Sequence, residues 1–237
     1  MKATILVALI TATAFAQEPA APKPKRTLLK YTPPPSSATG VRTDGDGGSR
    51  SGGAQLPSLL VLTPNHVAMT TQAQPSLFRF QSGPAPKDVA VRFELTLVDP
   101  KSPKPLLKVG TALAEQKDGG AGIHRIQLAR QKISLEPGVP YKWSVALVPD
   151  AKNRSQDLVA SGVVQMMPPT PELSAELEKA GTDKAAIYAA NGVWYDALSS
   201  LSDQIDAAPK DAALRAARAD LLQQAGLKTA AEFERKK

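Results

Sequence analysis

The chain has 237 residues, with 29 basic and 22 acidic side chains, a net charge of +7 and no cysteine. The lack of cysteine excludes disulfides, thiol catalysis and thiolate metal sites. The basic charge does not indicate nucleic-acid binding, because no motif combines basic and aromatic side chains, and no nucleic acid is expected as a partner.

The first sixteen residues have the pattern of a secretory signal peptide. Lys2 gives a positive start, residues 3–12 form an apolar run, and Ala14 and Ala16 are small residues of the kind that a signal peptidase reads. The apolar run is short of the roughly 20 residues that span a bilayer. We therefore predict cleavage after Ala16, export to the periplasm or the medium, and no transmembrane segment.

Residues 17–58 are predicted to form a disordered tether. They are rich in proline in EPAAPKPKRT and YTPPPSSATG, and in glycine and serine in GDGGSRSGG, with few large apolar side chains. Within them TDGDGG resembles the start of a calcium loop. Counted from Asp44, however, the twelfth position holds Gln55 instead of the glutamate that such a loop needs. We expect linker here and no metal site.

Residues 59–168 predict a β-sandwich. In VAVRFELTLVD, alternation places Val91, Phe93 and Leu95 on one side, as in a strand with one buried face. Turn-forming residues separate this segment from others like it, and no helical pattern intervenes. Strands are predicted at 59–63, 67–71, 76–81, 89–99, 106–113, 123–128, 141–148 and 157–166. They favour an antiparallel sandwich of the immunoglobulin or fibronectin type III kind, within an α+β fold.

The segment LEPGVPYKW supports this kind of sandwich. A Pro-Gly turn followed by a tyrosine that opens a strand resembles a tyrosine corner, in which the phenol bonds back to the backbone. Tyr141 and Trp143 then share one face of the strand, and we expect them in the core. The alternative is an aromatic shelf for a sugar or a peptide.

Residues 170–237 change to helical periodicity. Thr170, Pro171 and Glu172 supply a capping hydroxyl, a first-turn proline and a first-turn acid. Positions thirty-four residues apart match: Ala185 and Ala219, Tyr188 and Leu222, Gly192 and Gly226, Ala197 and Ala231. With Pro209 closing the first unit, this period predicts a tetratricopeptide-like hairpin and part of a second. So few units do not form a peptide groove, so the helices are expected to pack on the sandwich or to cover one partner surface.

The stretch YAANGVWYDALSSL concentrates aromatic and polar side chains around an Asn-Gly pair. Gly192 is expected in a left-handed turn after the first helix. Trp194 is expected on the buried face of the second helix, with Tyr188 reaching it from the first. Tyr195 and Asp196 follow, and the helix dipole favours the negative charge of Asp196 in the first turn. We interpret these residues as a structural motif.

Motifs of catalysis and metal binding are absent from the sequence. His66 and His124 are the only histidines and lie in separate segments, without the spacing of a metal site. GSRSG has an arginine where a nucleophile elbow needs serine. No Walker loop, dinucleotide fingerprint or HExxH occurs. We expect no enzyme activity, no cofactor and no metal, although two acids on neighbouring strands would leave no linear trace.

Several segments together carry a family resemblance. They are GGSRSGG, LLVLTPN, SLFRF, EPGVPYKWSVALV, GVVQ, AAIYAANGVWYDALSSL and APKDAALRAARADLLQQAGL. In this order the chain resembles the bacterial domain of unknown function 928 family over residues 48–227, most specifically in the Gly-Val-Trp-Tyr-Asp-Ala core. The sequence departs from the family where a cysteine is frequent after Trp143, since Leu147 and Val148 lead directly to Pro149 here. The resemblance implies an envelope-associated protein and no catalytic residue.

Three functions follow as hypotheses. The first is a non-enzymatic envelope protein that contacts other envelope proteins through its helical part. The second is a module that binds carbohydrate or peptidoglycan, with Tyr141, Trp143 or Trp194 as the stacking surface. The third, an envelope hydrolase, needs a cleft with paired acids.

Overall fold

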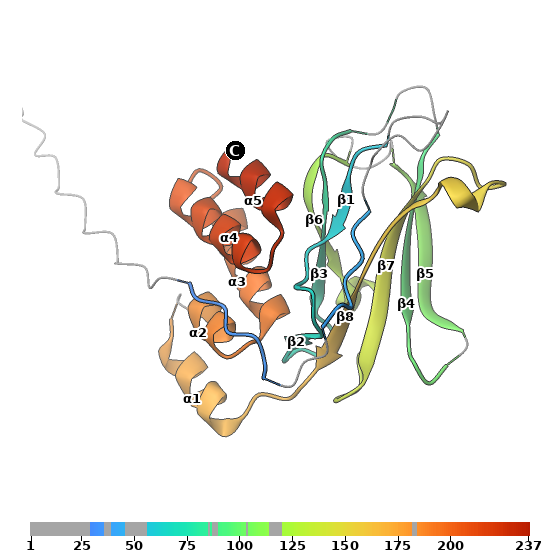
Figure 1. The fold of residues 1–237 in the computed structure, drawn as a ribbon. Helices are drawn as coiled ribbons and strands as arrows, with labels where there is room; N and C mark the ends of the chain where they lie inside the picture. Colours follow the sequence, from blue (N-terminus) through green and yellow to red (C-terminus); the bar gives the residue numbers. More distant parts are fainter. Residues whose placement is uncertain are drawn as a thin grey trace, which may run out of the picture.

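The computed structural model shows a mixed α+β fold of two sheets and five helices in its described part. The residues that it describes are 29–35, 39–45, 56–84, 86, 90–102, 104–113, 120–181 and 184–237. The predicted signal peptide at 1–16 lies outside them. In Figure 1 the helices, a small sheet and a larger sheet form three successive layers.

The described strands form two sheets that face each other. The smaller sheet has the order β1-β3-β6, and the larger one has the order β2-β8-β7-β4-β5. The strands are β1 Leu59–Val61, β2 Ala68–Thr70, β3 Ser76–Gln81, β4 Arg92–Val98, β5 Pro105–Ala112, β6 Gly122–Gln127, β7 Pro140–Val148 and β8 Leu158–Met166. Each of them overlaps one of the strand segments predicted from the sequence.

One strand corrects the prediction of an antiparallel arrangement. β2 pairs parallel with β8, with Ala68 opposite Val164 and Thr70 opposite Met166. The chain reaches β2 by passing from the smaller sheet to the larger one through residues 62–67, not through a hairpin. Because only strands joined by a tight hairpin must run antiparallel, this change of sheet allows the parallel pair.

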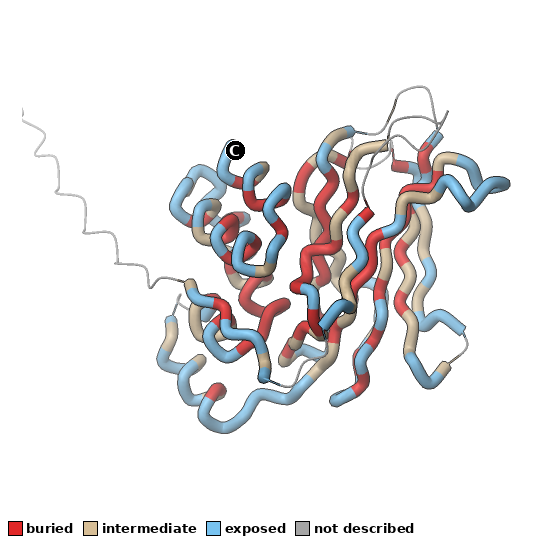
Figure 2. Tube along the Cα trace, in the orientation of Figure 1, coloured by how far each residue is buried: buried red, intermediate tan, exposed pale blue. Residues whose placement is uncertain are grey.

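The smaller sheet is the middle layer, and β3 is buried on both of its faces. Toward the larger sheet, the guanidinium of Arg79 lies 4.5 Å from the centre of the Phe93 ring. Toward the helices, the Phe80 ring lies 5.2 Å from the ring of Phe233. Burial lowers the pKa of Arg79 to about 10. This position explains why SLFRFQ has no exposed side, although Arg79 and Gln81 are polar. Figure 2 shows buried residues gathered where the helices meet this sheet.

The helices form the third layer. They are α1 Pro171–Lys179, α2 Lys184–Ala190, α3 Trp194–Ala207, α4 Ala212–Gln224 and α5 Lys228–Arg235. α1 begins as predicted, since the Leu173 N–H donates to the Thr170 hydroxyl at 3.2 Å. α2 packs on α3 and α4 on α5, while α3 lies against β2 and β3 and α5 against β6.

No helix in the described part of the chain is long and apolar enough to cross a membrane.

Part of the predicted tether belongs to the folded body. Residues 29–35 lie along the helices, where the Thr32 N–H donates to the Ala189 carbonyl at 3.0 Å. The Tyr31 N–H donates to Gln224 Oε1 at 2.8 Å, and the Tyr31 side chain is only 7% exposed. The prediction of a tether from 17 to 58 is therefore wrong at these residues, because their partners lie far along the chain and composition cannot show them.

A second piece of the predicted tether joins the two sheets. Thr43 exchanges backbone hydrogen bonds of 2.9 and 2.8 Å with Ser161 of β8, and Gly45 exchanges two of 3.0 Å with Leu59 of β1. Arg42 reaches the helices by donating to the Ala225 carbonyl at 3.0 Å. We call the described residues 29–35 and 39–45 the N-terminal strap, since they bind all three layers.

Candidate functional site

The motif YAANGVWYDALSSL lies at the junction between the helices and the sheets. Trp194 opens α3 with a ring that is 0% exposed. Its Nε1 donates to the Leu62 carbonyl at 2.8 Å, and the Tyr31 ring meets it edge-on at 5.1 Å between centroids. Trp194 therefore connects α3, the residue that follows β1 and the N-terminal strap at one buried point.

Tyr195 continues the junction into the space between the sheets. Trp143 Nε1 donates to the Tyr195 hydroxyl at 2.9 Å, and that hydroxyl lies 3.2 Å from Thr63 Oγ1. Burial raises the pKa of Tyr195, so the phenol stays protonated and can donate. The predicted core position of Trp143 is confirmed by its 0% exposure.

Asp196 fixes the first turn of α3 to the end of β2. Its carboxylate accepts from Thr70 Oγ1 at 2.6 Å, Thr71 Oγ1 at 2.7 Å and the Thr71 N–H at 3.1 Å. Burial raises the pKa of Asp196, and these hydrogen bonds oppose that shift. The predicted position of Asp196 in the first turn is confirmed. The hydrogen bonds from Thr70 and Thr71 were not predicted, and they stabilise this carboxylate in addition to the helix dipole.

An open cleft of about 320 Å³ lies above these contacts. Its walls are α2, α3 and the connection from β2 to β3. The lining residues are Thr70, Gln72, Gln74, Pro75, Ser76, Lys184, Tyr188, Tyr195, Asp196, Ser199, Ser200 and Asp203. We call this the junction cleft. Hydroxyl and amide groups dominate its lining, and its size suits a small polar ligand.

Tyr188 gives the junction cleft a partly exposed aromatic ring. It stands on α2 and is half-buried, whereas Tyr195 in the same cleft is almost fully buried. Burial raises the pKa of Tyr188, and the nearby negative charge of Asp196 adds to the shift. The phenol therefore remains neutral at physiological pH and can both donate and accept a hydrogen bond.

Both carboxylates of the cleft already have protein partners. Asp196 accepts the three hydrogen bonds from Thr70 and Thr71, and Asp203 forms an ion pair with Arg125 of β6. This lining can orient a ligand through hydrogen bonds.

The aromatic residues proposed as a stacking surface are not available to a ligand. Tyr141, Trp143 and Trp194 are exposed by 2%, 0% and 0%. The Tyr141 hydroxyl accepts from the Glu136 N–H at 3.2 Å, the backward bond that a tyrosine corner requires. The hypothesis of a sugar or peptide shelf on these three side chains is therefore wrong.

The remaining motif residues occupy turns and helix contacts. Gly192 and Gly226 have φ angles of +75° and +74°, in the left-handed region that favours glycine. Ala197 is fully buried on α3, and Pro209 lies exposed between α3 and α4. These residues shape the helical layer, and none of them lines the junction cleft.

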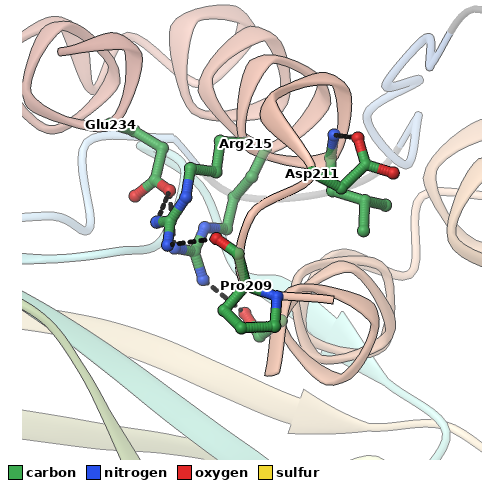
Figure 3. Close-up of polar contacts among 7 residues, drawn as sticks. Pro209, Asp211, Arg215 and Glu234 are labelled. Carbon is green, nitrogen blue, oxygen red and sulfur yellow. Dashed lines mark hydrogen bonds and ion pairs between the residues drawn. The ribbon is translucent and has the colours of Figure 1, made fainter. Parts of the chain in front are cut away.

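A buried ionic cluster on the helices was not predicted from the sequence. Glu234, at 2% exposure, accepts from Arg215 at 3.1 Å and from Arg218 at 2.8 Å. Arg215 also donates to the Pro209 carbonyl, as Figure 3 shows, and Arg218 donates to Ser202 Oγ. The spacing of three between the arginines puts both on one side of α4, and the repeated arginines were the available signal.

Each of the two histidines has a polar partner within the protein. The Tyr31 hydroxyl lies 3.1 Å from His66 Nε2, and His124 Nε2 donates to the Gly120 carbonyl at 2.8 Å. Among the described residues, no three His, Cys, Asp or Glu side chains gather as metal ligands would. Asp44, from the calcium-like segment, pairs with Arg42 at 3.0 Å, while residues 46–48 of that segment lie outside the described residues.

Comparisons with known proteins place the chain in a family. No curated protein matches it. Residues 45–234 match the family described as Domain of Unknown Function (DUF928), and this match spans both sheets and nearly the whole helical layer. It includes every residue that lines the junction cleft, but not Tyr31 of the N-terminal strap, and it agrees with the resemblance seen in the sequence. The chain belongs to this family of domains of unknown function.

Proposed function

We propose that the protein is an exported, non-enzymatic binding protein of the cell envelope, whose junction cleft holds a polyhydroxylated ligand such as a glycan. The observation that carries this proposal is the lining of the cleft, where hydroxyl and amide side chains surround the ring of Tyr188. A sugar presents hydroxyls that donate and accept, and an apolar C–H face that packs on an aromatic ring.

The cleft offers these contacts on three sides. Gln72 and Gln74 are exposed amides on the connection from β2 to β3, and Ser199 and Ser200 are hydroxyls on α3. Each amide and hydroxyl can donate and accept. Lys184 stands at the α2 wall as an exposed cation, which would suit a carboxylate or phosphate on an envelope glycan.

The same lining argues against hydrolysis. A glycosidase needs one carboxylic acid and one carboxylate that both face the scissile bond. In the junction cleft Asp196 is held by Thr70 and Thr71, and Asp203 by Arg125. Binding without turnover is therefore the function that these contacts support.

The fold assignments predicted from the sequence form part of this proposal. We infer an immunoglobulin-like sandwich, supported by sheets of three and five strands and by the hydrogen bond from the Glu136 N–H to the Tyr141 hydroxyl. We infer a tetratricopeptide-like pair of hairpins, supported by the left-handed φ angles that Gly192 and Gly226 share thirty-four residues apart. We also propose that residues 1–16 are a signal peptide that is removed during export. The mature protein recovered from the envelope should then begin at Gln17, which mass spectrometry can check.

A titration of the full-length protein with soluble peptidoglycan fragments tests the binding proposal. We expect saturable NMR shifts at the amides of α2, α3 and the β2–β3 connection. Tyr188→Ala should weaken binding at least tenfold, because it removes the ring and the hydroxyl together, and Gln72→Ala should weaken it less. Gln156→Ala, on the exposed turn Arg154–Gln156 outside the cleft, is the matched control and should change nothing.

Two results would contradict the proposal. One is the absence of saturable shifts at millimolar concentrations of the fragments. The other is binding that Tyr188→Ala and Gln156→Ala leave equally intact, since the ligand would then lie elsewhere. Contact with an envelope protein remains the second candidate function, and a separate observation on the edge of the smaller sheet favours it.

A further inference from the structure

The two sheets are unequal in width, which leaves an opening on one side. β6 is the last strand of the three-stranded sheet, and β5 is the last strand of the five-stranded sheet that faces it. A groove of about 270 Å³ lies between them. Its principal lining residues are Phe93, Leu95, Val109, Arg125, Ile126 and Arg130. We call it the open-edge groove.

β6 also has a backbone edge that no described strand covers. In the described part of the chain it pairs with β3 alone, with Ile126 opposite Leu77 and Arg125 opposite Phe78. The outer edge of such a strand presents N–H and C=O groups that another strand can pair with. The open-edge groove thus combines a free backbone edge with an apolar floor that a neighbouring strand would cover.

One positive charge at the open-edge groove has no acidic partner among the described residues. Arg130 is exposed on the short helical turn Leu128–Gln131, and no ion pair to it is formed by the described residues. Arg125 lies on the other side of β6 from Ile126, since side chains alternate along a strand. On that side Arg125 is paired with Asp203 and Asp206 of α3. A strand added next to β6 would therefore meet apolar groups on its inner face and the charge of Arg130 at its end.

The geometry points to an extended peptide segment of a partner protein, with apolar residues in alternation and an acidic residue at the end near Arg130, as the occupant of this groove. It adds to β6 as a fourth strand and places its apolar side chains against the half-buried Val109 and Ile126. The acidic side chain at its end meets Arg130. Backbone pairing provides affinity in this mode, and the alternate side chains provide specificity.

The charge pattern favours a partner protein over residues 17–28 of the protein itself. Residues 17–28, QEPAAPKPKRTL, contain three basic side chains and one acidic side chain, and they would be repelled by Arg130. A fatty acyl anion would match the apolar floor and Arg130, but it would leave the free edge of β6 without a partner. The peptide satisfies the apolar, charged and backbone features together.

The test uses the full-length protein labelled with ¹⁵N and a seven-residue peptide of alternating glutamate and valine. We expect saturable shifts at the amides of β6 and β5. Arg130→Glu should weaken binding at least tenfold. Lys108→Glu makes the same change of charge on β5, but at an exposed position adjacent to Val109 and thus on the opposite face, and should leave binding unchanged. Equal unfolding midpoints of the two variants show that both are folded.

Two further probes make the outcome decisive. A peptide with lysine in place of glutamate, and one with N-methyl groups along a single backbone edge, should both fail to bind. The proposal is overturned if millimolar peptide gives no saturable shift, or if Arg130→Glu and Lys108→Glu weaken binding equally. It is also overturned if the N-methylated peptide binds as well as the unmodified one, or if dodecanoate displaces the peptide from β6. A dimer that buries β6 in sedimentation experiments would also overturn it, in favour of a second copy.

Discussion

Trp194 shows how a single side chain connects parts of this protein that lie far apart in the sequence. Its ring contacts Tyr31 of the N-terminal strap and its Nε1 donates to the carbonyl of Leu62, 132 residues away. Its own backbone begins α3. Removing the side chain would open a cavity at the meeting point of the strap, the middle sheet and the helices.

Trp194→Ala is therefore expected to lower the free energy of unfolding by about 3–5 kcal/mol. Trp194→Phe keeps most of the volume but leaves the Leu62 carbonyl without its donor, and should cost about 1–3 kcal/mol. Urea denaturation followed by circular dichroism measures both. An alanine variant as stable as the wild type, yet unable to bind peptidoglycan fragments, would instead make Trp194 part of a ligand site.

Asp196 makes stability depend on pH. Because burial raises its pKa, the folded protein binds the proton more tightly than the unfolded chain, in which an aspartate has a pKa of about 3.9. The contribution to stability is thus fully present below about pH 4 and is lost as the pH rises through the folded pKa.

Asp196→Asn removes this titration and gives the comparison. The free energy of unfolding of the wild type, minus that of Asp196→Asn, should be largest at low pH and should fall as the pH increases above about 4. Chemical unfolding between pH 3 and 8 measures the difference. A difference that grows with pH would mean that the bonds from Thr70 and Thr71 stabilise the ionised carboxylate more than burial opposes it.

At the scale of elements, the two turn glycines differ in what surrounds them. Gly192 and Gly226 share a left-handed conformation, but a Cβ on Gly192 would lie 3.0 Å from the Thr32 carbonyl oxygen and 3.1 Å from the ring of Pro34. A Cβ on Gly226 would meet nothing within 4 Å. The strap therefore makes one turn crowded and leaves the other open.

Gly226→Ala should cost about 1–2 kcal/mol, since it adds the strain of a left-handed residue and little else. Gly192→Ala should cost more, because the added methyl group also forces the strap away from the turn between α2 and α3. Thermal unfolding of the two single variants compares the effects directly. Equal losses of stability in the two variants would show that the strap moves away from the methyl group without a measurable cost in free energy.

The elements themselves were largely predictable, and their long-range contacts were not. The alternation in VAVRFELTLVD and the turn residues around it are local signals, and they identified β4 as they identified the other strands. Thr170 and Gly192 are likewise local signals for where helices begin and turn. The family was also visible in the sequence, because its core motif is contiguous.

The strap and the cleft escaped prediction because their partners are distant in sequence. Tyr31 is ordered by Gln224, 193 residues away, and the proline-rich segment around it has no period that indicates burial. Asp196 meets Thr70 and Thr71 across 126 and 125 residues. A helix dipole was the only reason that the sequence could offer for that carboxylate, and the cleft beside it has no linear signature.

At the scale of the whole molecule, the three layers are expected to unfold as one unit. Trp143 and Tyr195 connect the larger sheet to α3, Arg125 and Asp203 connect β6 to α3, and the strap crosses all three layers. Contacts of this kind make separate unfolding of the helices costly, because the buried groups on both sides would lose their partners.

Unfolding of the full-length protein should therefore give coincident transitions by tryptophan fluorescence and far-ultraviolet circular dichroism. Tyr31→Ala should shift both midpoints together and lower the free energy of unfolding by about 2–4 kcal/mol, since it removes a buried ring from the junction. Tyr31→Phe, which loses the hydroxyl's hydrogen bond with His66 but keeps the ring, should shift them less. Transitions that separate in Tyr31→Ala would show instead that the helices and the sheets are independent folding units.

The strap also sets the reach of the protein. If the signal peptide is removed after Ala16, twelve residues, 17–28, separate the new amino terminus from the first described strap residue. A chain of this length extends to about 40 Å at most, whereas a tether running to residue 58 would extend more than three times as far. If the amino terminus were anchored, the junction cleft and the open-edge groove would therefore stay close to the anchor. They could then bind only ligands that lie near the anchoring point.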